Sequence, residues 1–198
     1  MNFLAHLHIA EHCQSSLLGN LLGDFVKGNP NGKFPEPVVS GIKLHRFVDT
    51  LTDHHATLSD IKPLFTGHRR RFCAIALDMF WDHCLAKQWQ DYHPDSLEHF
   101  CQNAEQKIKH EMGLLEPGAI PTRFITVSEH MWQGRWLESY RDLNNIELAL
   151  MRMSTRSIRM DPLKSCFPVL EHHYEVLMAV FRQLYPDVLT AAKRHVIC

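Results

Sequence analysis

The chain has 198 residues, 45% hydrophobic and 22% charged, so it can bury a core, and its composition excludes disordered, collagen-like and low-complexity proteins. Its formal net charge of −1 excludes a bulk positive field that would hold nucleic acid or an anionic membrane surface. Without an 18-residue apolar run, we expect no membrane-spanning helix. The cysteines form no CxxC pair, which favours reduced thiols in a cytoplasmic protein.

Helical periodicity runs through almost the whole sequence, and alternating strand patterns are nearly absent. Ser15 and Ser16 are cap-like residues before a helix that continues to about Phe25. Further helices are predicted over about 38–55, 69–89, 94–112, 122–139, 141–153 and 165–184, with a last one after Pro186. The pattern predicts an all-α fold, a single-domain helical bundle over residues 1–198 with about seven to nine helices.

Two carboxylates stand in an unexpected place in the helix predicted over about 69–89. Residues 72–85 are apolar nearly all round the helix, so most of its faces are expected to be buried. Asp78 and Asp82 nevertheless lie four residues apart on one side, and His83 follows directly. Such carboxylates repel each other and lose hydration, so they need a cation, which can be arginine, lysine or a metal ion.

Three other segments show histidine or aspartate in otherwise apolar surroundings. In order along the chain, these residues are His6, His8, Asp24, His45, Asp49 and Asp53, the last three at i, i+4 and i+8 of one helix face. Each group alone has a simpler explanation as a surface histidine, a turn residue or a solvated helix face. Their convergence favours a divalent metal such as manganese, iron, zinc or magnesium, because mixed imidazole and carboxylate ligands suit these ions.

Basic residues cluster where a helix is predicted to begin. Arg69, Arg70 and Arg71 are unfavourable near a helix N-terminus, which indicates an anionic ligand or partner, with a solvated helix start as the alternative. The segment 151–164 contains both arginines and methionines. This composition suits an adaptable protein-binding surface, with an ordinary helix end as the alternative.

Four stretches of the first 90 residues resemble one known family. They read MNFLAHLH, GNLLGDFVKG, GIKLHRFVDTLTDHH and RRRFCAIALDMFWDHCLA, and they are similar to the acyl carrier protein phosphodiesterases, also called acyl carrier protein hydrolases. The resemblance implies a fold related to the HD-domain phosphohydrolases. It implies hydrolysis of holo-acyl carrier protein to apo-protein and 4′-phosphopantetheine, with a divalent metal, typically Mn²⁺, and Mg²⁺, Fe²⁺ or Co²⁺ as alternatives.

The resemblance also implies site residues. The expected metal ligands are Asp24, His45, Asp78 and Asp82, together with His6 or His8. Asp49 or His83 is expected to orient the attacking water, with Asp24 as a further catalytic residue. Apart from the resemblance, we expect a nearby arginine, Arg46, to stabilise the phosphoryl charge in the transition state. The His-Asp dipeptide that gives the HD proteins their name is missing; the order is reversed at 53–54 and 82–83, so the exact ligand set stays open.

Acyl carrier proteins are acidic, so we expect holo-acyl carrier protein to dock on Arg69, Arg70 and Arg71. The sequence leaves the oligomeric state open. One rival function is an HD-type metal phosphohydrolase that acts on nucleotides or other small phosphoesters without a docking surface. Another is a non-enzymatic helical protein that binds metal or a partner, although such bundles typically use Glu-x-x-His motifs. A purely structural scaffold would not explain the buried charges.

Overall fold

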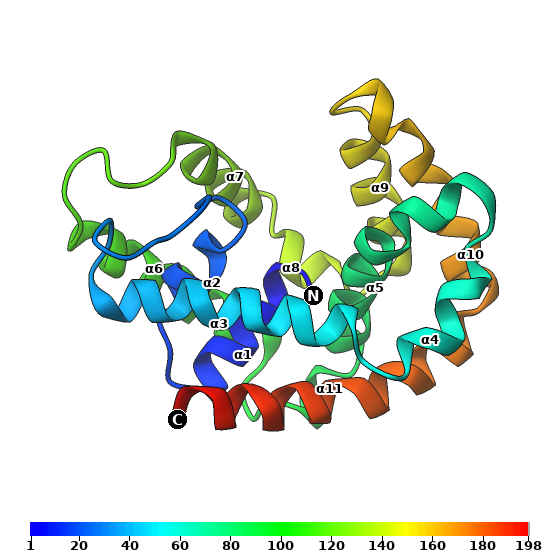
Figure 1. Cartoon of the computed structure of the whole chain (residues 1–198), viewed down its shortest axis with the longest axis horizontal. Coiled ribbons are helices and arrows are strands. Elements are labelled where there is room, and N and C mark those ends of the chain that lie inside the picture. Colours follow the sequence, from blue (N-terminus) through cyan, green and yellow to red (C-terminus); the bar gives the residue numbers. More distant parts are fainter. Residues whose placement is uncertain (198) are drawn as a thin grey trace.

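The computed structural model describes residues 1–197, and within these residues all regular elements are helices. The α-helices are α1(Phe3–His12), α2(Leu17–Leu22), α3(Glu36–Asp53), α4(Leu58–Ile61), α5(Cys73–Lys87), α6(Leu97–Gly113), α7(Thr122–Gln133), α8(Trp136–Ser139), α9(Leu143–Ser154), α10(Phe167–His172) and α11(Tyr174–Ile197). The 3-10 helices are η1(Lys62–Leu64), η2(Gly67–Phe72), η3(Trp89–Asp91) and η4(Ile158–Cys166). The predicted all-α fold is confirmed (Figure 1).

Helix α1 lies in the middle of the fold and has no counterpart among the helices predicted from the sequence. All residues from Leu4 to Ala10 are buried, and the helix contacts α2, α3, α5 and α11. Figure 1 shows it behind α3 and above α11. A helix that is buried on every side has no polar stripe, so its amphipathic signal is weak. The two histidines of the opening segment are therefore carried into the core.

Helices α2 and α3 cross at two glycines. A Cβ atom on Gly19 would lie 2.5 Å from the carbonyl oxygen of Val38, and one on Gly41 would lie 2.9 Å from the Cα of Gly19. The two backbones are thus in direct contact, an approach that larger residues would prevent. Ser16 caps α2 by accepting a hydrogen bond from the Gly19 amide, as its position before the helix predicts. This crossing brings the end of α2 against the middle of α3.

Several predicted boundaries are wrong. Residues 69–72, expected as the start of an α-helix, belong to η2, and α5 begins only at Cys73. The predicted helix 122–139 is divided into α7 and α8, because Arg135 adopts a left-handed conformation with φ 48°. Helix α11 continues through Pro186, where the sequence predicts a break. Tyr185 and Val188 on either side are fully buried, and their packing holds the helix together.

Within residues 1–197, no helix has both the length and the apolar character that a bilayer crossing requires, as predicted.

Candidate metal centre

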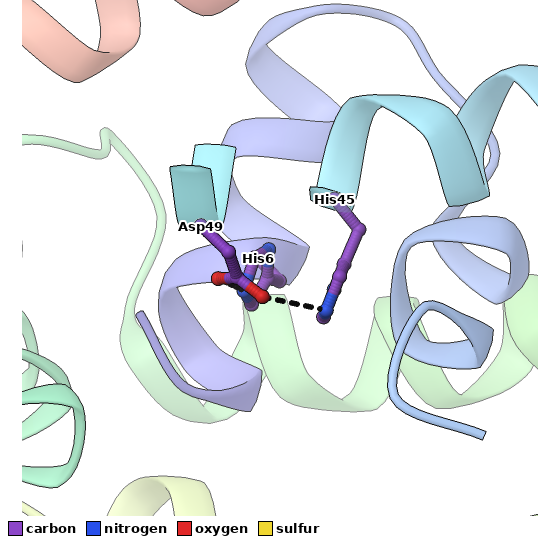
Figure 2. Close-up of side chains that lie close together, drawn as sticks. All are labelled: His6, His45 and Asp49. Atoms are coloured by element: carbon purple, nitrogen blue, oxygen red, sulfur yellow. Dashed lines mark hydrogen bonds and ion pairs between the residues drawn. The ribbon is translucent and has the colours of Figure 1, made fainter. Parts of the chain in front are cut away.

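Three side chains from two helices converge on one point: His6 from α1, and His45 and Asp49 from α3 (Figure 2). The Nε2 atom of His6 lies 3.0 Å from Oδ1 of Asp49, and Nε2 of His45 lies 3.1 Å from Oδ2 of the same carboxylate. Both histidines are buried, whereas 37% of the Asp49 side chain is exposed. The two imidazoles are therefore shielded from solvent, whereas solvent can reach the Asp49 carboxylate. We call these residues and Asp24 the metal cluster.

Asp24 reaches the same point from the chain just after α2. Its Oδ1 atom lies 3.4 Å from Nε2 of His45, so that nitrogen faces two carboxylates. The preceding Gly23 packs against the His45 ring, and a Cβ atom there would lie only 2.2 Å from it. Glycine is required because any side chain at this position would displace the imidazole.

Asp78 adjoins the metal cluster through the amino group of Met1. This buried ammonium lies 2.6 Å from Oδ1 of Asp78 and 3.6 Å from Oδ1 of Asp49. Burial acts to lower the pKa of the amine, but Asp78 and Asp49 outweigh it and raise the pKa to about 10. The sequence predicts a cation beside Asp78, and the Met1 amino group is such a cation.

The two histidines of the cluster have opposite electrostatic surroundings. Burial, and then the neighbouring His45, lower the pKa of His6 to about 4. Burial would also lower the pKa of His45, but hydrogen bonds to Asp24 and Asp49 outweigh it and raise that pKa to about 9. Although burial opposes it, the two imidazoles hold the pKa of Asp49 well below its usual range. In the absence of a metal ion, the His45 proton is therefore the cation between the carboxylates.

The donor set fits a divalent ion. The three ligand atoms of His6, His45 and Asp49 lie within 4.8 Å of one another, and imidazole with carboxylate suits manganese, iron or zinc. The Nδ1 atoms of both histidines are buried and have no hydrogen-bond partner among residues 1–197, so the rings are not committed to other polar groups. A bound ion would replace the His45 proton, because metals bind neutral imidazole.

His8 lies away from the metal cluster. It stands two residues after His6, which turns its side chain to the opposite side of α1. Its Nδ1 atom lies 2.7 Å from the hydroxyl of Tyr185, and Nε2 lies 3.3 Å from the carbonyl oxygen of Tyr92. Burial lowers the pKa of His8 to about 4. Both ring nitrogens thus have protein partners.

Asp82 and His83 also have partners outside the metal cluster. The Asp82 carboxylate accepts hydrogen bonds from the backbone amides of Leu4, at 2.8 Å, and Ala5, at 3.0 Å, and so caps α1. Burial raises the pKa of Asp82 to about 7, although these two amides oppose the shift. His83 lies 2.7 Å from the carbonyl oxygen of Tyr140 and 2.9 Å from the hydroxyl of Tyr174.

The arginines named from the sequence lie in two other places. Arg46 follows His45 in α3 and donates hydrogen bonds to the carbonyl oxygens of Val26, at 2.6 Å, and Gly28, at 2.8 Å. It therefore fixes the loop after α2, and within the described residues no hydrogen bond or ion pair joins its side chain to the metal cluster. Arg70 and Arg71 are exposed on η2, with Arg69 half-buried beside them.

Two contributors to the site were not predicted from the sequence. Gly23 has no predicted role, although a glycine directly before a candidate ligand is a signal for close backbone approach. The amino group of Met1 carries no sequence signal at all, because its position depends on the packing of α1 against α5.

Comparison with known proteins identifies the family of this chain. The sequence model of the acyl carrier protein phosphodiesterase family matches residues 1–188. Proteins of that name from Escherichia coli O6:K15:H31 and Enterobacter sp. are 41% and 40% identical to this chain, and each alignment covers 98% of both chains. One from Klebsiella pneumoniae is 39% identical with the same coverage. No solved structure gives a significant match. The chain belongs to the acyl carrier protein phosphodiesterase family.

Proposed function

We propose that this protein hydrolyses the phosphodiester that joins 4′-phosphopantetheine to a serine of holo-acyl carrier protein. The observation that carries the proposal is the convergence of His6, His45 and Asp49 in a chain whose family match spans residues 1–188. The products are apo-acyl carrier protein and 4′-phosphopantetheine. The oxygen of water forms a bond to phosphorus while the bond from phosphorus to the serine oxygen breaks, and the serine oxygen takes up a proton.

We further propose that His6, His45, Asp49 and Asp24 hold a divalent ion, with Mn²⁺ as the first candidate. Such an ion supplies positive charge against the phosphate and lowers the pKa of water from 15.7 toward about 7. His6 and His45 offer nitrogen ligands from a buried layer, and Asp49, which bonds to both rings when no ion is present, offers a carboxylate oxygen beside them. The Met1 ammonium contacts both Asp49 and Asp78. Asp78 thus lies next to the four proposed ligands, as the further carboxylate that the sequence predicts near the ion.

We assign the orientation of the attacking water to Asp24. Its carboxylate contacts His45, and 53% of the side chain is exposed. Asp24 is therefore a member of the metal cluster that can also reach the substrate. The His45 contact keeps the pKa of Asp24 low despite burial, and the carboxylate is therefore ionised and able to accept a hydrogen bond from water at neutral pH. Arg46, which bonds to two backbone carbonyls, has no part in this proposal.

A cytoplasmic location suits this protein. Cys13, Cys73, Cys84, Cys101 and Cys166 are free and buried. Free thiols of this kind are typical of a reducing compartment. The substrate, holo-acyl carrier protein, would have to be present in the same compartment.

Mass spectrometry of holo-acyl carrier protein tests the function. Incubation with the protein and Mn²⁺ should remove the mass of the 4′-phosphopantetheine arm. Prior treatment with a chelator should abolish the change, and added Mn²⁺ should restore it. Nucleoside monophosphates serve as the parallel substrates: their hydrolysis, with the carrier protein left intact, would instead support a nucleotide phosphohydrolase.

A further inference from the structure

A pocket of about 440 Å³ lies between α7 and α9, next to the metal cluster. Figure 1 shows these two helices standing on either side of the N-terminus. Arg123 and Val127 come from α7, and Leu148 and Arg152 come from α9. Asp24 also lines the pocket, so the pocket and the metal cluster share a side chain.

The lining combines positive charge with apolar surface. Arg123, Arg152 and Arg156 supply three guanidinium groups, and none of them forms an ion pair with a carboxylate in the described part of the chain. The guanidinium of Arg123 lies 5.5 Å from the centre of the Phe25 ring, beside Asp24. Unpaired arginines around a single carboxylate favour an anionic ligand.

The rest of the wall is largely apolar. The residues that supply this surface are Phe3, Phe25, Met79, Val127, Leu148, Ala149 and Met153. A ligand that fits must therefore have a charged end near the metal cluster and a longer, partly apolar remainder. Pockets for small ligands begin at about 300 Å³, so this pocket is large enough for such a group.

We propose that this pocket binds the 4′-phosphopantetheine arm of the substrate, an inference that rests on the proposed function. The arm is an extended chain with two neutral amides, two methyl groups on one carbon and a phosphate at one end. The phosphate lies toward Asp24 and the metal cluster, at the end of the pocket where Arg123 packs on the Phe25 ring. The neutral part of the arm lies against the apolar side chains of α7 and α9. The carrier protein stays outside the pocket.

The test is calorimetric titration of the manganese-loaded protein with 4′-phosphopantetheine and, separately, with inorganic phosphate. Helix α9 offers a matched pair of variants, because Leu148 and Met151 are both 47% exposed but only Leu148 lines the pocket. Leu148→Asp should raise the Kd for 4′-phosphopantetheine about tenfold or more and leave the Kd for phosphate unchanged. Met151→Asp should change neither. Arg152→Ala, compared with Arg159→Ala outside the pocket, should likewise weaken binding of 4′-phosphopantetheine.

Two binding results would overturn the inference. One is that 4′-phosphopantetheine binds no more tightly than inorganic phosphate; the other is that Met151→Asp weakens its binding as much as Leu148→Asp does. Cleavage of holo-acyl carrier protein, measured on the same wild-type sample, reports separately on the function. Binding that shows the predicted pattern without cleavage would support the pocket and reject the phosphodiesterase. Cleavage with equal KM in both aspartate variants would support the enzyme and reject the pocket.

Discussion

The imidazole rings of His6 and His45 stack with their centroids 3.8 Å apart, although one comes from α1 and the other from α3. The single carboxylate of Asp49 contacts both rings through its two oxygens. Two buried imidazoles at this distance repel each other when both are protonated, and the low pKa of His6 reflects that repulsion together with burial. This pairing is the basis of the proposed metal site and of the predictions that follow.

Gly23→Ala should damage the metal site without touching a ligand. The added methyl group would meet the His45 ring at 2.2 Å, so the imidazole must move. We expect manganese affinity, measured by calorimetric titration, to fall about tenfold or more, as for other changes that misorient a ligand. Gly113→Ala is the matched control because no atom lies within 4 Å of the new methyl group. Equal affinities in the two variants would show that the contact with Gly23 does not position His45.

Asp82→Ala should reduce stability more than it reduces metal affinity. The variant loses two hydrogen bonds to the backbone amides of Leu4 and Ala5, so the first turn of α1 is left uncapped. We expect a loss of about 1–3 kcal/mol in the free energy of unfolding, measured with urea. Asp82→Asn retains one acceptor oxygen and should lose less. A variant of full stability that no longer binds manganese would instead make Asp82 a ligand.

His8 should make the protein less stable in mild acid. Its pKa is about 4 when folded, against an ordinary value of 6.5, so the unfolded chain binds the proton more readily. Stability from this group is complete above pH 6.5 and is lost as the pH falls toward 4. At pH 5 we expect the loss to be about 2 kcal/mol.

The comparison for this prediction is His8→Leu, which has no proton to bind. Its free energy of unfolding should be lower at pH 7, because the hydroxyl of Tyr185 loses its partner, yet fall less between pH 7 and pH 5. Urea unfolding at the two pH values measures both effects. Parallel declines in the wild type and in His8→Leu would contradict the assignment.

Reversing the charge on η2 tests the predicted docking surface. Arg69→Glu/Arg70→Glu should raise the KM for holo-acyl carrier protein and leave hydrolysis of a small phosphodiester unchanged. The difference from the wild type should shrink at 1 M salt, where the Debye length is about 3 Å instead of about 10 Å at 0.1 M. If both substrates are affected equally, these arginines act on the catalytic site and not on docking.

A site residue can be predicted when its signal is local in the sequence, and not when its position depends on contacts between helices. His45 and Asp49 are four residues apart in one helix, so their shared face follows from the helical repeat. The cap provided by Ser16 has a local signal in the same way. Asp24 and His6 join them through contacts between α1, α2 and α3, which single-sequence periodicity does not report.

For buried polar residues, the sequence predicts burial but does not identify the partners. Burial of Asp82 and His83 follows from their apolar helix, but their partners are a backbone terminus and two tyrosines from distant segments. A buried carboxylate and a metal ligand have the same sequence signal, because both are polar residues on an apolar face. At Pro186 the local signal is strong but misleading. Proline favours the end of a helix, yet the packing of its buried neighbours keeps α11 continuous.

The most direct test of the metal cluster is a manganese titration of the wild type, Asp49→Asn and Asp53→Asn. Asp53 is exposed one turn beyond Asp49 on α3 and therefore controls for the loss of a carboxylate from this helix. We expect the wild type and Asp53→Asn to bind Mn²⁺ equally, and Asp49→Asn to bind it about 100-fold more weakly. Equal manganese affinity in Asp49→Asn and the wild type would contradict the account.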